Sequence, residues 1–215
     1  MADVVKLSAM SFIKQINGVV MVSLFVNMFI KIFFLLTPFF VMTMFLAMTR
    51  TLTPEASRRI AIRTSIAILI TAFILFYFGN IIFNLLGITT QSFQIGAGAL
   101  LFLSAVKLVH GQEQPKASES DDIAVVPLAI PLTVGPGTTG TLLVLGAEYS
   151  GLTKLVASGA LFCAIVVVAV LLLSATKIEQ FLGAKRIAVL TKLTGLVLSA
   201  LAAQLIFTGI YNFPH

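Results

Sequence analysis

The chain has 215 residues, of which 59% are hydrophobic and only 10% are charged. Soluble domains are typically about 45–50% apolar and about 25% charged, and a chain of this size buries only about 70% of its surface on folding. Lipid must therefore be the solvent for most of the chain. This composition excludes an aqueous enzyme, a nucleic-acid-binding domain and a disordered chain.

The basic residues also fit a membrane protein. The formal net charge is +6, and membrane proteins gather Lys and Arg in their cytoplasmic loops. No stretch interleaves these residues with exposed aromatic side chains, so we expect no nucleic-acid partner. The single cysteine, Cys163, lies in an apolar run and can form neither an intrachain disulfide nor a multi-cysteine metal site.

The chain begins with a prefix, residues 1–24, in which Lys6, Lys14 and Asn17 interrupt the apolar side chains. This pattern predicts an interfacial helix or a segment that leads into the first span. A cleaved signal peptide is less favoured, because no convincing small-residue cleavage site follows a short apolar core.

Six segments then follow that are apolar enough to cross a hydrocarbon core about 30 Å thick, which takes about 20 residues of helix. They lack the alternation of barrel strands, so we predict an all-α membrane protein with six transmembrane helices. The predicted spans are 25–48, 60–84, 91–110, 123–146, 153–174 and 187–210.

A polar linker, residues 111–122, divides the spans into a first set, 25–110, and a second set, 123–215. Related halves with three spans each would have inverted topologies. Of the fourteen Lys and Arg residues, nine lie on the linker's side of the membrane and three on the other. The linker is therefore predicted to be cytoplasmic, with both termini outside the cytoplasm.

Two interruptions suggest that the halves are related. Thr37-Pro38 interrupts the first span, and a run of prolines and glycines from Pro127 to Gly137 interrupts the fourth. An offset of 98 residues places Thr37-Pro38 on Gly135-Pro136. Because proline removes a helical donor and glycine loosens the chain, we predict two inverted three-helix repeats with broken helices 1 and 4.

Backbone groups freed at these breaks cannot face lipid, so they must face protein or a water-filled cavity. Half-helix amino ends attract carboxylates and unwound carbonyls coordinate cations, so paired breaks are typical of a transporter site. The alternative is a pair of proline kinks whose threonines bond back to their own helices. The predicted substrate-binding residues are Thr37, Pro38, Thr43, Thr133, Gly135, Pro136, Gly137, Thr138 and Thr139.

Further residues could support this site, although each has a simpler explanation. Close helix packing also accounts for Gly98, and a hydrogen bond between helices accounts for Gln204. Snorkelling to the membrane surface accounts for Lys192 and is expected of Lys31. The supporting residues are Gln94, Gly98, Lys192 and Gln204.

Every Asp and Glu falls outside the apolar runs, and His110 only ends the third span. Proton-driven carriers usually rely on intramembrane carboxylates or histidines. We therefore predict no catalytic residue, no metal site and no cofactor. A coupling cation held by carbonyl and hydroxyl oxygens is one alternative, and transport without a coupling ion is the other.

The run Val126–Gly137, VPLAIPLTVGPG, resembles the VPLAxPxxxGPG signature of the MarC family, six-span bacterial inner-membrane proteins also called neutral amino acid transporters. The likeness covers about residues 27–212 and includes Gly87-Ile88 before the third span and Gly209-Ile210 in the sixth. The resemblance implies a multi-pass inner-membrane protein that transports small neutral amino acids such as alanine or glycine.

The first family motif is changed in this chain. Thr37 stands in place of the family's Asn or Asp, Phe40 in place of its glycine and Thr43 in place of its second proline. Phe40 would narrow the site, and the change at Thr37 weakens any transfer of ion coupling from the family. Gln94 and Lys192 stand where the family often has arginine.

The sequence thus predicts a secondary transporter or exporter of a small polar solute, a neutral amino acid, that works by alternating access around a midplane site between the two breaks. Its expected partners are this solute and the lipid bilayer, and no oligomeric state is predicted. The alternatives are a passive channel, which linear flux would identify, and a non-transporting assembly partner. In the assembly partner, substituting Gly137 would change stability without changing solute movement.

Overall fold

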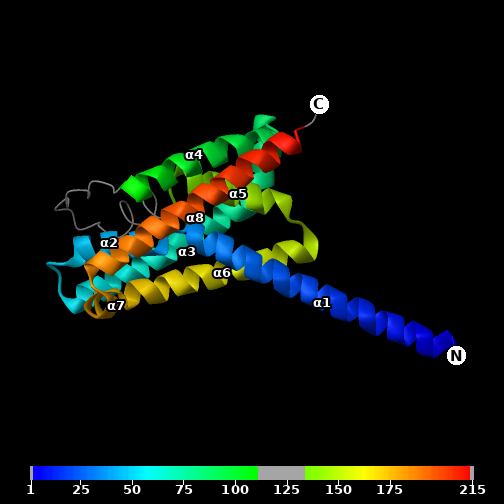
Figure 1. Ribbon diagram of the computed structural model, residues 1–215, viewed down its shortest axis with the longest axis horizontal. Coiled ribbons are helices and arrows are strands. Elements are labelled where there is room, and N and C mark those ends of the chain that lie inside the picture. Colours follow the sequence, from blue (N-terminus) through cyan, green and yellow to red (C-terminus); the bar gives the residue numbers. More distant parts are fainter. Residues whose placement is uncertain (1, 111–133, 214–215) are drawn as a thin grey trace.

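The computed structural model describes residues 2–110 and 134–213, with side chains from residue 18 onward. These residues form eight α-helices and no strand (Figure 1). The predicted all-helical fold is confirmed for this part of the chain. In order, the helices are α1 (Ala2–Leu35), α2 (Pro38–Thr49), α3 (Pro54–Leu86), α4 (Thr90–His110), α5 (Pro136–Glu148), α6 (Gly151–Leu173), α7 (Ala175–Leu182) and α8 (Ala184–Tyr211).

Proline and glycine set several helix ends. The helices α2, α3 and α5 begin at Pro38, Pro54 and Pro136. At the first position of a helix the backbone N–H has no partner within the helix, so proline loses no hydrogen bond there. The side chain of Thr53 caps α3, and Gly87 ends it in the left-handed conformation that glycine adopts without strain.

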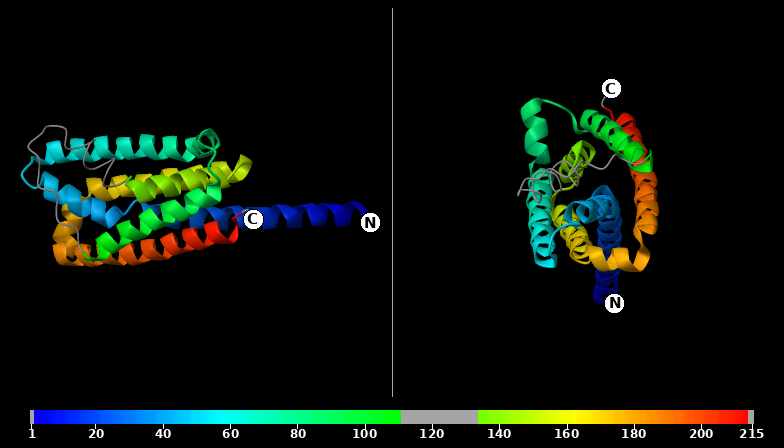
Figure 2. Two further views of the ribbon diagram at one scale, coloured as in Figure 1. Left: turned by 90° about the horizontal axis from the view of Figure 1, so that it is seen from above. Right: turned by 90° about the vertical axis from the view of Figure 1, so that its left-hand side faces the viewer.

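The short helices α2 and α5 occupy the centre of the bundle, and most of their residues are buried. In a view along the bundle, α3, α4, α6 and α8 surround them (Figure 2). α4 packs along α8, α1 packs against α6, and α5 packs against both α3 and α4. α2 and α5 run from the middle of the bundle toward opposite ends (Figure 1).

Two glycines bring α3 and α5 into backbone contact. A β-carbon on Gly146 of α5 would overlap the carbonyl oxygen of Phe76 in α3. A β-carbon on Gly79 of α3 would overlap the carbonyl oxygen of Leu143 in α5. Small residues at such crossings are typical of helices that pack in a membrane.

The outer faces of the long helices are apolar. Ile66, Ile70 and Ile74 recur every four residues along α3, and each is about half exposed. Contiguous apolar surface of this kind is rare on soluble monomers, so lipid is the expected neighbour. Among the described residues, five helical segments are long and apolar enough to cross a membrane: Gly18–Thr49, Pro54–Leu86, Thr90–His110, Gly151–Leu173 and Ala184–Tyr211.

Some predicted boundaries fall outside the described residues, and others shift. The linker 111–122 lies outside them, and the fourth predicted span, 123–146, is described only from residue 134 onward. α1 continues without a break from the predicted prefix into the first span. α3 begins at Pro54, ahead of the predicted span 60–84, because the cap at Thr53 starts the helix before the apolar run, so Arg58 and Arg59 are already helical.

Candidate functional site

The helix of the first span is interrupted at the first predicted break. α1 ends at Leu35, α2 begins at Pro38, and Thr37 between them has a left-handed backbone with φ of 47°. Such a conformation is uncommon for a non-glycine residue, and strained positions of this kind gather at functional sites. Thr37 is buried, so its strain is maintained by the packing around it.

The structure brings the second break against the first. α5 begins at Pro136 after Gly135, and the Thr138 hydroxyl donates a hydrogen bond of 3.2 Å to the carbonyl oxygen of Leu35. Carbonyls at the end of a helix lack partners within it, and this hydroxyl supplies one. Two segments far apart in sequence therefore meet in the interior of the bundle.

The other predicted threonines bond to carbonyls close by in the chain. Thr43 donates to the carbonyl of Phe39 at 2.9 Å, and Thr139 donates to that of Val134 at 3.3 Å. Gly137 packs against the backbone of α4, where an added β-carbon would lie 2.7 Å from the Cα of Leu101. Thr133 lies outside the described residues.

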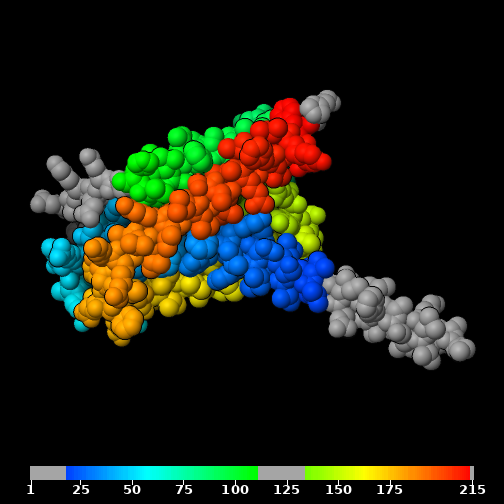
Figure 3. Space-filling model, viewed as in Figure 1, coloured from blue at the N-terminus to red at the C-terminus, as the bar shows by residue number. Residues whose placement is uncertain are grey.

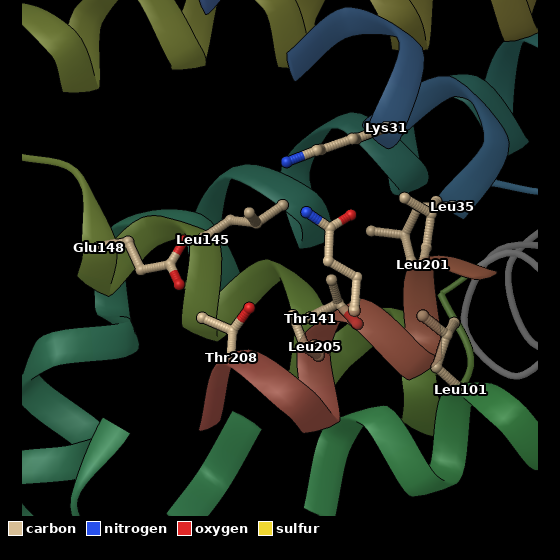
Figure 4. Close-up of a pocket in the computed structure, with 10 residues that line it drawn as sticks. Lys31, Leu35, Leu101, Thr141, Leu145, Glu148, Leu201, Leu205 and Thr208 are labelled. Atoms are coloured by element: carbon tan, nitrogen blue, oxygen red, sulfur yellow. The ribbon is translucent and has the colours of Figure 1, made fainter. Parts of the chain in front are cut away.

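A pocket of about 170 Å³ lies beside these breaks. Cavities of about 150 Å³ can hold a molecule the size of benzene, and alanine has a similar number of heavy atoms. Figure 4 shows side chains from four helices converging on this space. The lining residues are Lys31, Leu35, Leu101, Thr141, Leu145, Glu148, Leu201, Gln204, Leu205 and Thr208.

Helical spacing explains why these side chains converge. Thr141, Leu145 and Glu148 fall on one face of α5, because residues four and seven positions apart align on a helix. Lys31 and Leu35 align in the same way on α1. The pocket thus extends from Leu35, beside the break, along about 10 Å of α5 to Glu148 at its end.

The two charged residues of the pocket were missed by sequence reasoning. We expected Lys31 to snorkel to the membrane surface, but its ammonium group points into the pocket (Figure 4). Glu148 follows the apolar run of the fourth span, yet its carboxylate also lines the pocket. No ion pair joins the two charges among the described residues. An apolar lining with a few convergent polar groups is typical of a small-molecule site.

Two of the predicted supporting residues lie at this pocket. Gln204 lines it directly. Gln94 is buried, and its amide group donates a hydrogen bond to Glu148. Because that bond fixes one carboxylate oxygen, Gln94 sets the orientation in which Glu148 faces the pocket.

The remaining two supporting residues lie elsewhere. Gly98 packs against α8, where a β-carbon would lie 2.6 Å from the side chain of Ile206, so close helix packing accounts for it. Lys192 is exposed on α8 and is not part of the pocket lining. Within the described residues, no three His, Cys, Asp or Glu side chains come together as a metal ion would require.

Comparison with known proteins identifies relatives over nearly the whole chain. A family model described as MarC family integral membrane protein matches residues 22–213. A UPF0056 membrane protein of Aquifex aeolicus is 34% identical, covering 88% of this chain and 93% of the relative. A Methanocaldococcus jannaschii relative is 33% identical, covering 86% and 95%.

A third relative, the UPF0056 membrane protein YhcE of Escherichia coli, is 30% identical over 86% of this chain and 92% of its own. No solved structure gives a significant match. The matched region contains both breaks and every residue that lines the pocket. With apolar outer helices and similarity of this extent, the chain belongs to the MarC family of integral membrane proteins.

Proposed function

We propose that this protein is a secondary transporter of a small zwitterion, a neutral amino acid such as alanine or glycine, which moves through the pocket by alternating access. The observation that carries the proposal is the pair Lys31 and Glu148, opposite charges on different helices that line one small pocket. Lys31 lies inside a helix long and apolar enough to span the membrane, where an ionisable residue is costly and typically marks a substrate path. Glu148 is exposed at the carboxyl end of α5 and faces the same pocket.

The pocket chemistry matches both ends of a zwitterion. The ammonium of Lys31 would bind the substrate carboxylate, and the carboxylate of Glu148 would bind the substrate ammonium. Gln204 and Thr208 supply further polar atoms, while the leucines of the lining leave room for a small apolar side chain. A solute with only one charge would leave one of the two protein charges without a partner.

The helix ends at the break favour Lys31 over the backbone amides of Gly137–Thr139 as the carboxylate partner. The amino end of a helix carries partial positive charge and the carboxyl end partial negative charge. The hydrogen bond from Thr138 to Leu35 brings these opposite ends of α5 and α1 together, so their fields partly offset each other. Lys31 carries a full charge one helical turn from Leu35.

The packing supports two inverted three-helix repeats with a break in the first and fourth spans. α2 and α5 begin at Pro38 and Pro136, 98 residues apart, and run toward opposite ends of the bundle (Figure 1). α5 packs on α3 and α4 as α2 packs on α6 and α8, and α4 pairs with α8. A two-fold axis would produce this exchange of partners, and one half could then rock against the other.

The distribution of basic residues supports an orientation in the plasma membrane. Arg50, Arg58 and Lys177 lie at the end of the bundle where α2 gives way to α3 and α6 to α7. The turns before α4 and α6 and the end of α8 lie at the opposite end (Figure 1). By the excess of Lys and Arg, the first end faces the cytoplasm and the second the outside.

The proposal is tested by uptake of labelled alanine and glycine into proteoliposomes, with and without sodium and proton gradients. We expect saturable flux that unlabelled alanine inhibits. Lactate, which lacks the ammonium group, and alaninamide, which lacks the carboxylate, should inhibit at least tenfold less well, because each loses one charge-assisted contact worth about 1.5–3 kcal/mol.

Other outcomes would separate the alternatives. Linear flux without saturation would identify a passive channel. Absence of saturable flux for any small amino acid, with monodisperse protein in the liposomes, would refute the substrate. If lactate inhibited as well as alanine does, the role given to Glu148 would be refuted. If alaninamide inhibited as well as alanine does, the role given to Lys31 would be refuted.

A further inference from the structure

A second hollow lies at the basic end of the bundle, away from the pocket described above. Its volume is about 710 Å³, and it is bounded by the end of α2, the beginning of α3, the end of α6 and the short helix α7. Figure 3 shows α7 in orange beside the segment before α3 in cyan at this end of the molecule. We call it the basic groove.

Three cations from three different segments line the basic groove. Arg50 follows α2, Arg58 lies in α3 and Lys177 lies in α7, and all three are exposed. One acid, Glu179 of α7, also lines it. The described lining of the groove therefore carries a formal excess of two positive charges.

The inner wall of the groove is apolar. Phe45 and Leu46 come from α2, and Leu172 and Leu173 come from the last turn of α6. The wall thus belongs to segments that cross the membrane, while the cations stand where those segments end. A ligand that fills the groove must have an anionic end and an apolar end.

We propose that the basic groove binds an anionic phospholipid, with the headgroup among Arg50, Arg58 and Lys177 and an acyl chain along the apolar wall. Basic pockets between membrane helices on the cytoplasmic side have the chemistry that anionic headgroups require. A zwitterionic lipid would add its own cation to a groove that is already positive. A free phosphate would leave the apolar wall uncovered.

The proposal is tested by native mass spectrometry of the purified full chain titrated with phosphatidylglycerol or phosphatidylcholine. We expect phosphatidylglycerol to bind at least tenfold more tightly than phosphatidylcholine. Each of Arg50→Gln, Arg58→Gln and Lys177→Gln should weaken phosphatidylglycerol binding about fivefold, because a basic residue near an anionic lipid surface contributes on the order of that factor.

The matched control removes basic residues on the same side but outside the groove, by Arg59→Gln, Lys185→Gln or Arg186→Gln. These variants keep the same net charge as the groove variants and should bind phosphatidylglycerol within twofold of the unmodified chain. Glu179→Gln should act in the opposite sense and strengthen binding about fivefold, because it removes the groove's negative charge.

Several results would overturn the proposal. Equal losses in the groove and control variants would mean that net charge, and not this groove, attracts the lipid. Equal binding of the two lipids would exclude an anion site. Competition by inorganic phosphate, or by glycerophosphoglycerol without acyl chains, at concentrations similar to the lipid would show that the apolar wall is not used. Single substitutions of these exposed or partly exposed residues should leave folding intact, which thermal unfolding checks.

Discussion

The expected role of Lys31 and of Glu148 changes once the residues around them in the structure are known. In the sequence, Lys31 is a lone cation in an apolar helix, for which snorkelling is the ordinary explanation. Glu148 is an acid after an apolar run. In the structure both line the pocket, and buried Gln94 holds Glu148 in place. Their importance comes from convergence, which no local pattern reveals.

The charge of Lys31 should determine how tightly the substrate binds. Lys31→Gln removes the carboxylate partner while keeping a polar side chain, so we expect KM for alanine to rise about 10- to 100-fold, equivalent to the loss of about 1.5–3 kcal/mol. The measurement is initial uptake into proteoliposomes. Lys192→Gln, on α8 outside the pocket lining, is the control and should leave KM unchanged; similar effects of both would argue against the pocket.

The hydroxyl of Thr138 should stabilise the fold where the two breaks meet. Thr138→Val leaves the buried carbonyl of Leu35 without this donor, and we expect the free energy of unfolding to fall by about 1–3 kcal/mol. Thr43→Val is the control, because its hydroxyl bonds only to Phe39 four residues earlier in the same helix. Thermal unfolding in detergent should show a lower Tm for the first variant alone.

Among the helices, the crossing of α3 and α5 is the closest backbone contact built on glycine in the described residues. Gly146 and Gly79 each leave no room for a side chain, because a carbonyl oxygen of the other helix occupies that position. The contact fixes the position of α5 along the long axis of the bundle. It thereby fixes where α5 begins beside α1 and where Glu148 stands at its end.

Gly146→Ala should therefore separate α3 and α5. Backbone atoms cannot yield as a flexible side chain can, so we expect a loss of at least about 1–3 kcal/mol in stability and a lower Tm. Gly96→Ala is the matched control, since nothing lies within 4 Å of its added β-carbon. That change should be neutral or stabilise α4 by up to about 1 kcal/mol through helix propensity. Equal Tm values would contradict the close crossing.

The molecule combines a pocket that gathers several polar side chains with apolar flanks, and its basic residues are concentrated at one end. Nine of the fourteen Lys and Arg residues lie on the predicted cytoplasmic side, and the basic groove is at that end of the bundle. The pocket extends toward the other end, where α5 terminates. The orientation of the chain therefore decides on which side of the membrane the Glu148 end of the pocket lies.

The charge distribution predicts that the C-terminus lies outside the cytoplasm. An alkaline phosphatase domain fused after His215, in a bacterial host, should be exported and active. A fluorescent protein that matures only in the cytoplasm, fused at the same residue, should stay dark. The reverse pattern would mean that the pocket opens toward the cytoplasm and that the basic groove lies in the outer leaflet.

The sequence by itself determined the solvent, the helical class and the position of the first break. Composition and the length of apolar runs can be read from the sequence without knowing which residues are neighbours in space. Thr37-Pro38 interrupts the helix that contains it, because proline lacks the backbone N–H. Local pattern also selected Thr138, although it could not show that the hydroxyl reaches Leu35 in another helix.

Only the tertiary structure decided which polar groups share a pocket. Lys31, Glu148 and Gln204 come from three helices. Whether these side chains come close together depends on how each helix is rotated about its axis and shifted along it. The rotation and the shift are set by contacts such as the glycine crossing of α3 and α5. Local chemistry explains where a helix starts and stops, whereas the contents of a site depend on packing between segments distant in the chain.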